Sequence, residues 1–533
     1  MSGSDLSGSD VVVIGAGHNG LAAACYLARE GLEVTVVEAA DRVGGMTTSE
    51  PTVPGAPRHL MNVGALDATF IHATDVVTDL RLADFGYREV WLDPIWAYLH
   101  DDDDLSLAFW RDPRRTAAEI ERFSRSDARA YLDLARTLDA LISLSAPLLT
   151  AHPTRPGPRA LTAAARAVVK HRRDVREVVT LMASSCVEAI DERFRHPVVR
   201  GALGSLCSAF GPVLADGSSI VLLALGWYLR YGVSRPIGGT QAFPDALAAA
   251  LEKFGGTIRC GSAVDEVLVE GGRAVGVRLV GGEVLRARTA VLATCDPRTA
   301  LLSLLPAGSL DPRLEARAAR IPTLASNLAT VRVDVALSGR LNLNRFERRR
   351  GDGVDLRLPG VYMGTLENAV AAETAAASGR LPQVTNLYAA IPTGPDPSQA
   401  PDGQDTLWLY AHPMPLRPGQ PWETLRAEAG EHAVARAARF IDGIGEFEIG
   451  RTIDTPPDMA RRFRVSGGSL WHVDLSLFRL GPMRPARGLS GYRTPVGGFY
   501  LGSGGSHPTP GMSGLPGRLA SREILRGRKE RTA

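Results

Sequence analysis

Three glycines and an acid near the start of the chain have the types and spacing that hold a dinucleotide. Gly15, Gly17 and Gly20 precede Glu38. Glycines at this spacing let a pyrophosphate approach the main chain, and the amides at a helix N-terminus favour its negative charge. A carboxylate placed like Glu38 can accept hydrogen bonds from both hydroxyls of an adenosine ribose, and it would repel the phosphate of NADP. These residues therefore predict a dinucleotide site.

The residues around this motif predict the βαβ unit that must position it. Residues 11–14 are all apolar, as expected for a parallel strand buried on both faces. Residues 21–29 have helical composition and stop before Gly31. A second apolar run at 34–37 predicts the second strand, at whose end the acid stands.

The rest of the chain divides into a helical part and parts with short strands. Residues 90–235 have mostly helical composition, with an apolar stripe over 116–149 and a proline-rich break at 147–158. Glycine pairs and apolar runs predict short strands, which we expect at 257–259, 263–269, 274–280, 290–293 and 499–502.

Two glycine-rich segments at opposite ends of the chain favour FAD over NAD. Residues 38–45 match the extension that flavin oxidoreductases carry after their second strand. Within it, Arg42 can contact a pyrophosphate, and Gly44 and Gly45 let the chain pass close to a cofactor. The loop at 500–514 lies between an expected strand and an expected helix, so its amides can face the ribitol chain and the flavin.

These motifs resemble the phytoene desaturase-type family of FAD-dependent oxidoreductases. The resemblance is strongest to the branch that begins G-A-G-H-N-G and carries the label pyridine nucleotide-disulfide oxidoreductase domain-containing. Three further segments match the family, namely the P-x-G-G element within 235–247, the A-x-P element at 294–298, and the T-P-x-D and G-G-x-x-x-H elements within 455–472. The match spans nearly the whole chain.

The resemblance implies an α/β fold: a Rossmann-like FAD-binding domain with an inserted mixed α+β substrate domain and a helical cap. No internal repeat is visible in the sequence. The implied order is residues 1–90 for the first part of the FAD-binding domain, 91–235 for the helical cap, 236–310 for the second part of the FAD-binding domain, 311–480 for the substrate domain, and 481–533 for the C-terminal part of the FAD-binding domain.

The motifs and the resemblance together name a set of residues for non-covalent FAD. Val264 is expected to contact the adenine through its main chain. One departure from the family concerns the loop before the last helix, where Thr509 and Pro510 replace two glycines and stiffen the backbone. The full expected set is Gly15, Gly17, His18, Asn19, Gly20, Glu38, Ala39, Arg42, Gly44, Gly45, Met46, Val264, Gly504, Gly505, Gly511 and Met512.

Two histidines are the candidates for catalytic acid/base or orienting roles. His472 and His507 each lie in a family-like element, and a desaturation must deliver a proton as well as a hydride. Satisfying nearby backbone groups is the alternative role for both. The run Asp101–Asp104 has the residue type of a metal site, but we expect a solvated hairpin tip, and no metal is expected elsewhere.

The expected reaction removes a hydride and a proton from a C–C bond of an apolar or polyene-like small molecule, with the hydride going to flavin N5. Oxygen or a quinone would reoxidise the flavin, because no second glycine motif marks an NAD domain. Three alternatives stay open: a redox-neutral double-bond isomerase, a flavin amine oxidase, and a non-enzymatic scaffold. The amine oxidases use a lysine near N5, and Lys170, Lys253 and Lys529 match no such position.

Composition excludes several other classes of protein. A net charge of +2 gives no reason to expect a nucleic-acid partner. Five cysteines without a C-x-x-C pair argue against a disulfide scaffold, a zinc site and a redox dithiol. No run is long enough to span a membrane, so we expect a cytoplasmic protein. Peripheral membrane contact through the apolar run at 220–231 is a second hypothesis, and the oligomeric state is unknown.

Overall fold

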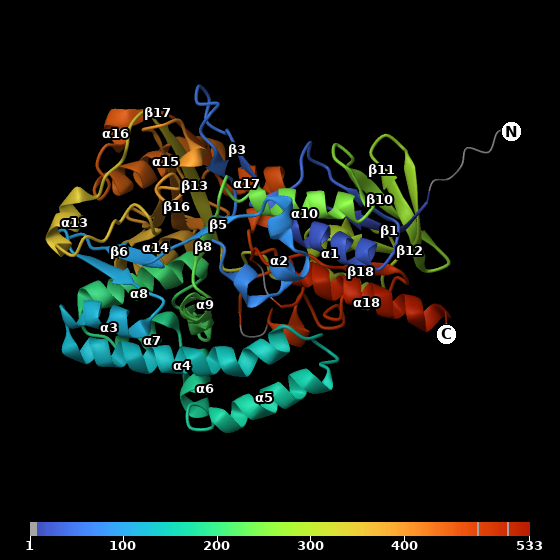
Figure 1. Cartoon of the computed structure of the whole chain (residues 1–533), viewed down its shortest axis with the longest axis horizontal. Helices are drawn as coiled ribbons and strands as arrows, with labels where there is room; N and C mark the ends of the chain where they lie inside the picture. The colour runs from blue at the N-terminus through green and yellow to red at the C-terminus, as the bar shows by residue number, and fades with distance from the viewer. Residues whose placement is uncertain (1–7, 477–478, 509–510, 533) are drawn as a thin grey trace.

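The computed structural model describes residues 8–476, 479–508 and 511–532, and two large sheets organise the chain (Figure 1). One sheet lies toward the N- and C-terminal ends of the chain, and the other lies at the opposite end of the molecule. Helices of residues 113–231 form a layer along the lower edge of the view. Thr509 and Pro510, the departure from the family loop, lie outside the described residues.

The first sheet confirms the βαβ unit and the short strands predicted from the sequence. Its order is β10-β11-β12-β1-β2-β9, and β18 pairs with β12. The pairs of β1 with β2, and of β12 with β1 and β18, are parallel. The strands are β1 (Ser9–Ile14), β2 (Val34–Val37), β9 (Thr257–Arg259), β10 (Val264–Glu270), β11 (Arg273–Leu279), β12 (Val284–Ala293) and β18 (Phe499–Leu501).

Helices cover both faces of this sheet, which is why the centre of β1 is buried and apolar throughout. One face packs against α1 (His18–Arg29), α10 (Ala242–Lys253) and α18 (Leu515–Thr532). The other face packs against α11 (Pro297–Leu302) and α12 (Pro312–Ala319). The helix α18 joins the two ends of the chain, because it packs directly on α1.

The second sheet comes from two distant parts of the chain. Its order is β17-β13-β16-β15-β14-β6-β7. The strands are β6 (Trp96–Leu99), β7 (Ser106–Phe109), β13 (Leu328–Leu337), β14 (Val361–Met363), β15 (Asn386–Ala390), β16 (Asp405–Pro415) and β17 (Glu448–Asp454). One face carries α8 (Pro197–Phe210) and α14 (Leu366–Ala377), and the other carries α15 (Trp422–Ala438).

The helical segment begins later than the sequence predicted. Residues 96–109 form the hairpin β6–β7 of the second sheet, so the segment 91–235 is not helical at its start. Short apolar runs fit a strand or a buried helix equally well, which explains the error. The predicted hairpin tip at Asp101–Asp104 is confirmed. The helices that follow are α3 (Pro113–Glu121), α4 (Arg125–Leu149), α5 (Pro158–Lys170), α6 (Val175–Ala183), α7 (Cys186–Asp191), α8 and α9 (Leu223–Tyr231).

Two details of the helical layer correct the sequence-based picture. Pro147 lies inside α4, and the break covers 150–157 instead of 147–158. The apolar run at 220–231 forms a short 3-10 turn and α9, and most of its large side chains are buried. This burial favours the interpretation of the run as a buried helix over membrane contact through it. Among the described residues, no helix is long and apolar enough to cross a bilayer.

Small elements complete the fold around the two sheets. A two-stranded pair, β5 with β8, links the ends of the helical segment, because residues 89–91 pair with 234–236. The remaining strands and helices are β3 (Ser49–Glu50), β4 (Met61–Asn62), β5 (Glu89–Trp91), β8 (Ser234–Pro236), α2 (Val76–Asp79), α13 (Asn344–Arg350), α16 (Ile444–Phe447) and α17 (Pro456–Phe463).

Candidate cofactor and substrate site

One cavity of about 680 Å³ is lined by residues from both sheets. At one end lie the carboxyl ends of β1, β2 and β12 with the loops that follow them, where ligands bind in open α/β sheets. At the other end lie side chains of β14, β15 and β16 from the second sheet. The cavity therefore places a ligand held by the first sheet in contact with the second.

The glycines of the first motif serve different purposes: some are required by close packing, and one leaves space for a ligand. Gly15 has a φ of +101°, which favours glycine. A Cβ at Gly20 would lie 2.0 Å from the carbonyl oxygen of Gly15, so helix α1 and the turn require a glycine there. A Cβ at Gly17 would meet no described protein atom closer than the Gly44 carbonyl oxygen at 4.0 Å. The space beside Gly17 is thus open toward the cavity.

The Glu38 carboxylate stands at the end of β2, where the sequence placed it. Its Oε2 accepts a hydrogen bond from the amide of Ala16 at 2.7 Å, and its Oε1 accepts one from the amide of Ala40 at 2.9 Å. A carboxylate has about four acceptor positions, so two hydrogen bonds from a ribose remain available. Arg42 also lines the cavity and donates to the Ser49 carbonyl and to Glu50.

Three side chains on the cavity wall carry buried polar atoms without a partner among the described residues. These atoms are Nε2 of His18, Oδ1 of Asn19 and Nδ1 of His472. Burial lowers the pKa of His18 to about 4, so its ring is neutral at pH 7. Buried polar groups are normally hydrogen-bonded, and three orphans around one cavity fit a polar ligand. Together with the space beside Gly17, they fit a dinucleotide.

The cavity brings together most of the residues that the sequence assigned to the cofactor. Gly15, Gly17, His18, Asn19, Glu38, Ala39, Arg42, Gly45, Met46, Val264, Gly504, Gly511 and Met512 all line it. Gly20, Gly44 and Gly505 do not. They pack behind the wall instead: Gly44 donates its amide to Ala16, and a Cβ at Gly505 would lie 2.4 Å from the Pro297 ring.

The two candidate catalytic histidines occupy different environments. His472 lines the cavity, has a left-handed φ of +58°, and has a pKa lowered by burial. His507 is not among the residues that line the cavity. Its Nε2 lies 3.1 Å from the Ala151 carbonyl oxygen, and burial lowers its pKa to about 4. This arrangement suits a role in holding the loop, which is the alternative role that the sequence left open for His507.

Sequence reasoning missed the aromatic wall of the second sheet. Tyr362 faces Tyr388 across β14 and β15, with ring centroids 4.5 Å apart. Trp408 and Tyr410, two residues apart on β16, stack at 5.6 Å. Phe210, Tyr228 and Trp471 line the same space. The period-two spacing of Trp408 and Tyr410 could have indicated a shared face.

A buried ion pair at this wall was also missed. The Asp67 carboxylate accepts a hydrogen bond from Arg235 Nε at 2.9 Å and one from the Tyr388 hydroxyl. The Arg235 side chain is 2% exposed and that of Asp67 is 15% exposed. Asp67 lines the cavity, and it adds a negative group to an otherwise aromatic end. The two residues lie 168 positions apart, so local pattern gives no signal for the pair.

The described residues contain no group of histidine, cysteine or acidic side chains that could hold a metal ion. None of the lysines is among the residues that line the cavity. Burial raises the pKa of Cys295, which does line it, to about 12, so its thiol is protonated. The residues that line the cavity can bind and orient a ligand and transfer a proton.

Comparison with known proteins agrees with this geometry. Residues 20–353 match the family model described as flavin containing amine oxidoreductase. The sequence is 30% identical to pyridine nucleotide-disulfide oxidoreductase domain-containing protein 2 from mouse (Mus musculus). The alignment covers 98% of this chain and 94% of the mouse protein. A neurosporene-forming phytoene desaturase from Cereibacter sphaeroides is 26% identical over 96% of this chain and 93% of that protein.

A solved oxidoreductase from Methanosarcina mazei has the same fold. It aligns with a TM-score of 0.60 and 15% identity, covering 97% of this chain and 99% of that one. The resemblance predicted from the glycine motifs is thereby confirmed, and so is the α/β fold class. An enzyme that uses a flavin for oxidation or reduction accounts for both the cavity and these likenesses. The chain belongs to the flavin-containing amine oxidoreductase family.

Proposed function

We propose that this flavin enzyme binds FAD without a covalent bond and desaturates an apolar, polyene-like molecule. The observation that carries the proposal is the single cavity with two unlike ends, one of glycines and Glu38 and one of aromatic side chains. When bound, FAD would supply the hydride acceptor at its N5 atom. The chain would bind and orient both molecules, exclude water and accept the proton.

The glycine end supports FAD as the flavin. Glu38 has free acceptor positions for an adenosine ribose, which the shorter flavin mononucleotide lacks. Gly17, Arg42 and Val264 line the same cavity as this carboxylate. Gly504 and Gly511 line the same cavity as Gly17 and Met46, so both glycine segments can contact one extended cofactor.

The aromatic end supports an apolar substrate. Tyrosine and tryptophan faces bind extended π systems by stacking and by burial of apolar area. Burial raises the pKa of Tyr362 and of Tyr388 well above the usual range, so both rings are neutral. The Cereibacter sphaeroides relative is named for a desaturation of phytoene, which is a substrate of this chemical kind.

His472 is the proposed proton acceptor. Its ring lines the cavity, its Nδ1 has no partner among the described residues, and burial lowers its pKa, so it is neutral and able to accept a proton. The Asp296 carboxylate favours the protonated ring, and Arg484 opposes it. Replacing His472 by Gln should slow substrate-dependent bleaching of bound flavin by about 100-fold or more. His432→Gln, an exposed histidine on α15, is the matched control.

The test is anaerobic mixing of the FAD-loaded protein with a panel of polyenes and acyl compounds. Bleaching of the flavin absorption by a polyene, with a product two mass units lighter, is the expected result. Readmission of oxygen, or addition of a quinone, should restore the absorption and identifies the electron acceptor. A protein that takes up no FAD, or bound flavin that no polyene bleaches, would overturn the proposal.

The same experiment separates the alternatives. A product of unchanged mass would identify an isomerase. Bleaching by amines would identify an amine oxidase, although none of the lysines is among the residues that line the cavity. Flavin-free protein that cannot be reconstituted would favour the scaffold. Each result contradicts the proposed desaturase.

A further inference from the structure

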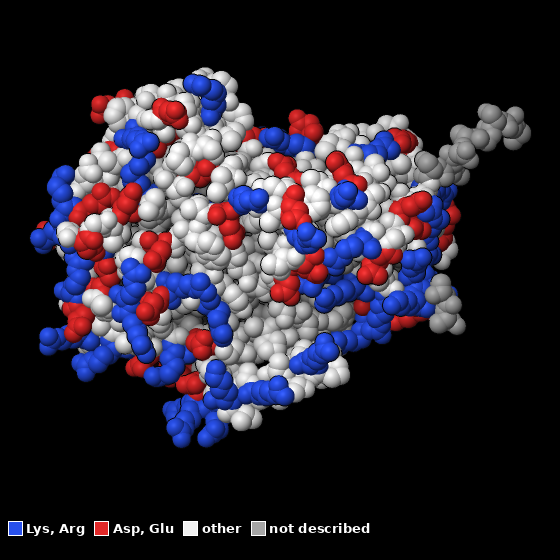
Figure 2. Space-filling model, viewed as in Figure 1, with Lys and Arg blue, Asp and Glu red and all other residues white. Residues whose placement is uncertain are grey.

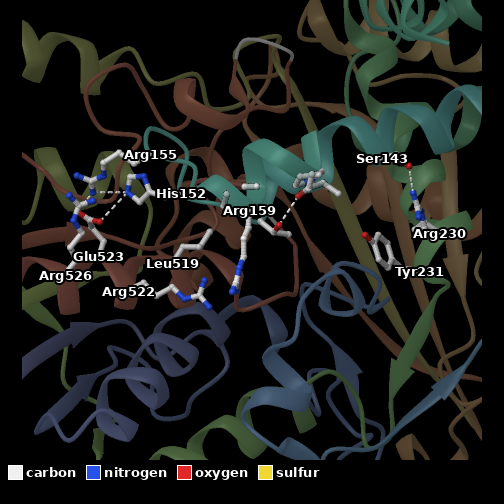
Figure 3. Close-up of a pocket in the computed structure, with 17 residues that line it drawn as sticks. Ser143, His152, Arg155, Arg159, Arg230, Tyr231, Leu519, Arg522, Glu523 and Arg526 are labelled. Carbon is white, nitrogen blue, oxygen red and sulfur yellow. Dashed lines mark hydrogen bonds and ion pairs between the residues drawn. The ribbon is translucent and has the colours of Figure 1, made fainter. Parts of the chain in front are cut away.

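A second cavity, separate from the flavin cavity, is lined by arginines. It has a volume of about 850 Å³ and lies between the end of α4, the start of α5, the end of α9, and α18 (Figure 3). Figure 2 shows basic side chains gathered over the elements that border it, along the lower right of the view. Its five arginines are Arg155, Arg159, Arg230, Arg522 and Arg526.

The only acid that lines this cavity, among the described residues, is already fully engaged. Glu523 is 3% exposed and forms ion pairs with Arg155 at 2.5 Å, with His152 at 3.5 Å and with Arg493. Buried acids need such partners, so this carboxylate cannot also neutralise the remaining arginines. The cavity therefore has an excess of positive charge.

Two of the remaining arginines have acids of their own. Arg230 pairs with Asp139 at 3.2 Å, and Arg526 pairs with Glu530 at 2.8 Å. Both acids lie outside the lining of the cavity. Neither arginine is therefore left to bind a ligand as an unpaired charge.

Arg159 and Arg522 differ from the other arginines. Neither forms an ion pair or a side-chain hydrogen bond with another described residue. Figure 3 shows their guanidinium groups pointing to the same side of the cavity. Burial and the charge of Arg518 lower the pKa of Arg522, while Tyr26, Asp79 and Asp75 act in the opposite direction.

Both side chains are exposed at the cavity and neither forms an ion pair with a described residue, so an anion placed between them would be attracted by two positive charges. The space beside them is apolar, with the side chains of Ala146, Pro147, Ala151, Ala160, Ala163 and Leu519. A ligand that satisfies both features has an anionic head and a short hydrocarbon part. A phosphomonoester carries a charge of about −1.5 to −2 at pH 7, which matches two arginines, and its oxygens suit guanidinium groups.

We propose that this cavity binds an alkyl phosphomonoester, with the phosphate between Arg159 and Arg522 and the alkyl chain on the alanines and Leu519. The site is independent of the flavin chemistry. It adjoins the loop that follows β18, since Ala151, which lines it, contacts His507 through its carbonyl oxygen. The His152 ring also meets the Tyr492 ring edge-on, with centroids 5.6 Å apart.

The test is calorimetric titration of the FAD-loaded full chain with hexyl phosphate. Loading with FAD keeps the pyrophosphate region of the first cavity occupied. We expect binding that weakens about tenfold in R159A or R522A, and about a hundredfold in the double variant. R114A, an exposed arginine on α3 outside both cavities, is the matched control and should leave binding unchanged. Thermal unfolding of each variant checks that the fold is intact.

Inorganic phosphate and hexanol divide the site into its two parts. Hexyl phosphate should bind more tightly than either of them, because inorganic phosphate would contact only the arginines and hexanol only the apolar wall. Equal affinity for inorganic and hexyl phosphate would contradict the alkyl part of the proposal. No binding to the wild type, or an unchanged dissociation constant in the double variant, would overturn it.

Discussion

The two ends of the flavin cavity are made from different chemical parts of the chain. The glycine end presents main-chain amides, one carboxylate and the space beside Gly17. The aromatic end presents side chains from three strands and a buried ion pair between Asp67 and Arg235. Main-chain groups cannot be exchanged by substitution, whereas side chains can. The proposed assignment of the cofactor to the first end and of the substrate to the second follows this difference.

The sharpest test of this contrast lies inside the glycine end. Gly17→Ala should leave the fold intact, because no described protein atom lies closer than 4.0 Å to the new Cβ, but it should block FAD. Gly20→Ala should instead destabilise the protein, because its Cβ would lie 2.0 Å from a carbonyl oxygen. Overpacking of this kind costs about 1–3 kcal/mol or more. Bound flavin per protein and the thermal midpoint measure the two effects.

The two alanine variants serve as controls for each other. The expected pattern is a flavin-free G17A with a nearly normal thermal midpoint, beside a G20A with a lowered one. If G17A retained a full complement of FAD, the space beside this glycine would not be the path of the cofactor, and the glycine end would need another role.

At the aromatic end, the largest effect is expected from Asp67→Ala. The change leaves the Arg235 guanidinium, 2% exposed, without its counter-ion. An uncompensated buried charge costs about 3–5 kcal/mol of unfolding free energy. Denaturant unfolding measures this cost. The glycine end lies on the first sheet, so FAD content at low temperature should change much less.

A double variant makes the cause of this loss visible. Asp67→Ala combined with Arg235→Met removes both charges, and replacement of a buried pair by apolar groups is often close to neutral. Recovery of most of the stability is therefore expected. If the double variant were as unstable as the single one, packing would explain the loss instead of the unpaired charge.

The same contrast explains what the sequence could predict. The glycine end is local: Gly15, Gly17, Gly20 and Glu38 lie on one βαβ unit, whose strand and helix patterns can be read from the chain. The aromatic end is non-local. Asp67 meets Arg235 and Tyr388 only because β8 and β15 are brought together by the fold. No periodicity in one sequence records such pairings.

The histidines illustrate a second limit. His472 and His507 both lie in family-like elements, and residue type alone could not distinguish them. The fold turns His472 toward the cavity, while it directs the His507 ring to the Ala151 carbonyl at the end of α4. The sequence predicted the tip of the hairpin at 101–104, but not the sheet that this hairpin joins. Its place in the second sheet depends on pairing with β14, which lies 264 residues away.

A smaller effect should appear in the pH dependence of stability. The folded pKa of His507 is about 4, below the ordinary value of 6.5, because the ring is buried. The folded state thus binds fewer protons than the unfolded state between these values. Stability from this group is complete above pH 6.5 and falls as the pH decreases toward 4, by about 3 kcal/mol.

His507→Gln tests this dependence, since an amide can still donate to the Ala151 carbonyl without titrating. The unfolding free energy of the variant should fall less steeply than that of the wild type between pH 6.5 and 4. His432→Gln, at an exposed position, should leave the slope unchanged. Parallel curves for H507Q and the wild type would show that this ring does not titrate with unfolding.

The smallest expected effect concerns the single side chain on which the glycine end depends. In Glu38→Gln, an NH2 group replaces one of the two carboxylate oxygens. This group donates hydrogen bonds and cannot accept them, so the bond from the amide of Ala16 or of Ala40 is lost, together with one acceptor position for the ribose. The loss of one charged acceptor predicts about tenfold weaker FAD binding. Glu30→Gln, an exposed acid directly after α1, is the isosteric control.

Titration of the deflavinated protein with FAD and with flavin mononucleotide gives both affinities. If Glu38 holds the ribose, only the FAD affinity should fall, because flavin mononucleotide has no adenosine. An equal loss for both flavins would place the effect on the turn between β1 and α1 instead, where the same carboxylate holds the Ala16 amide.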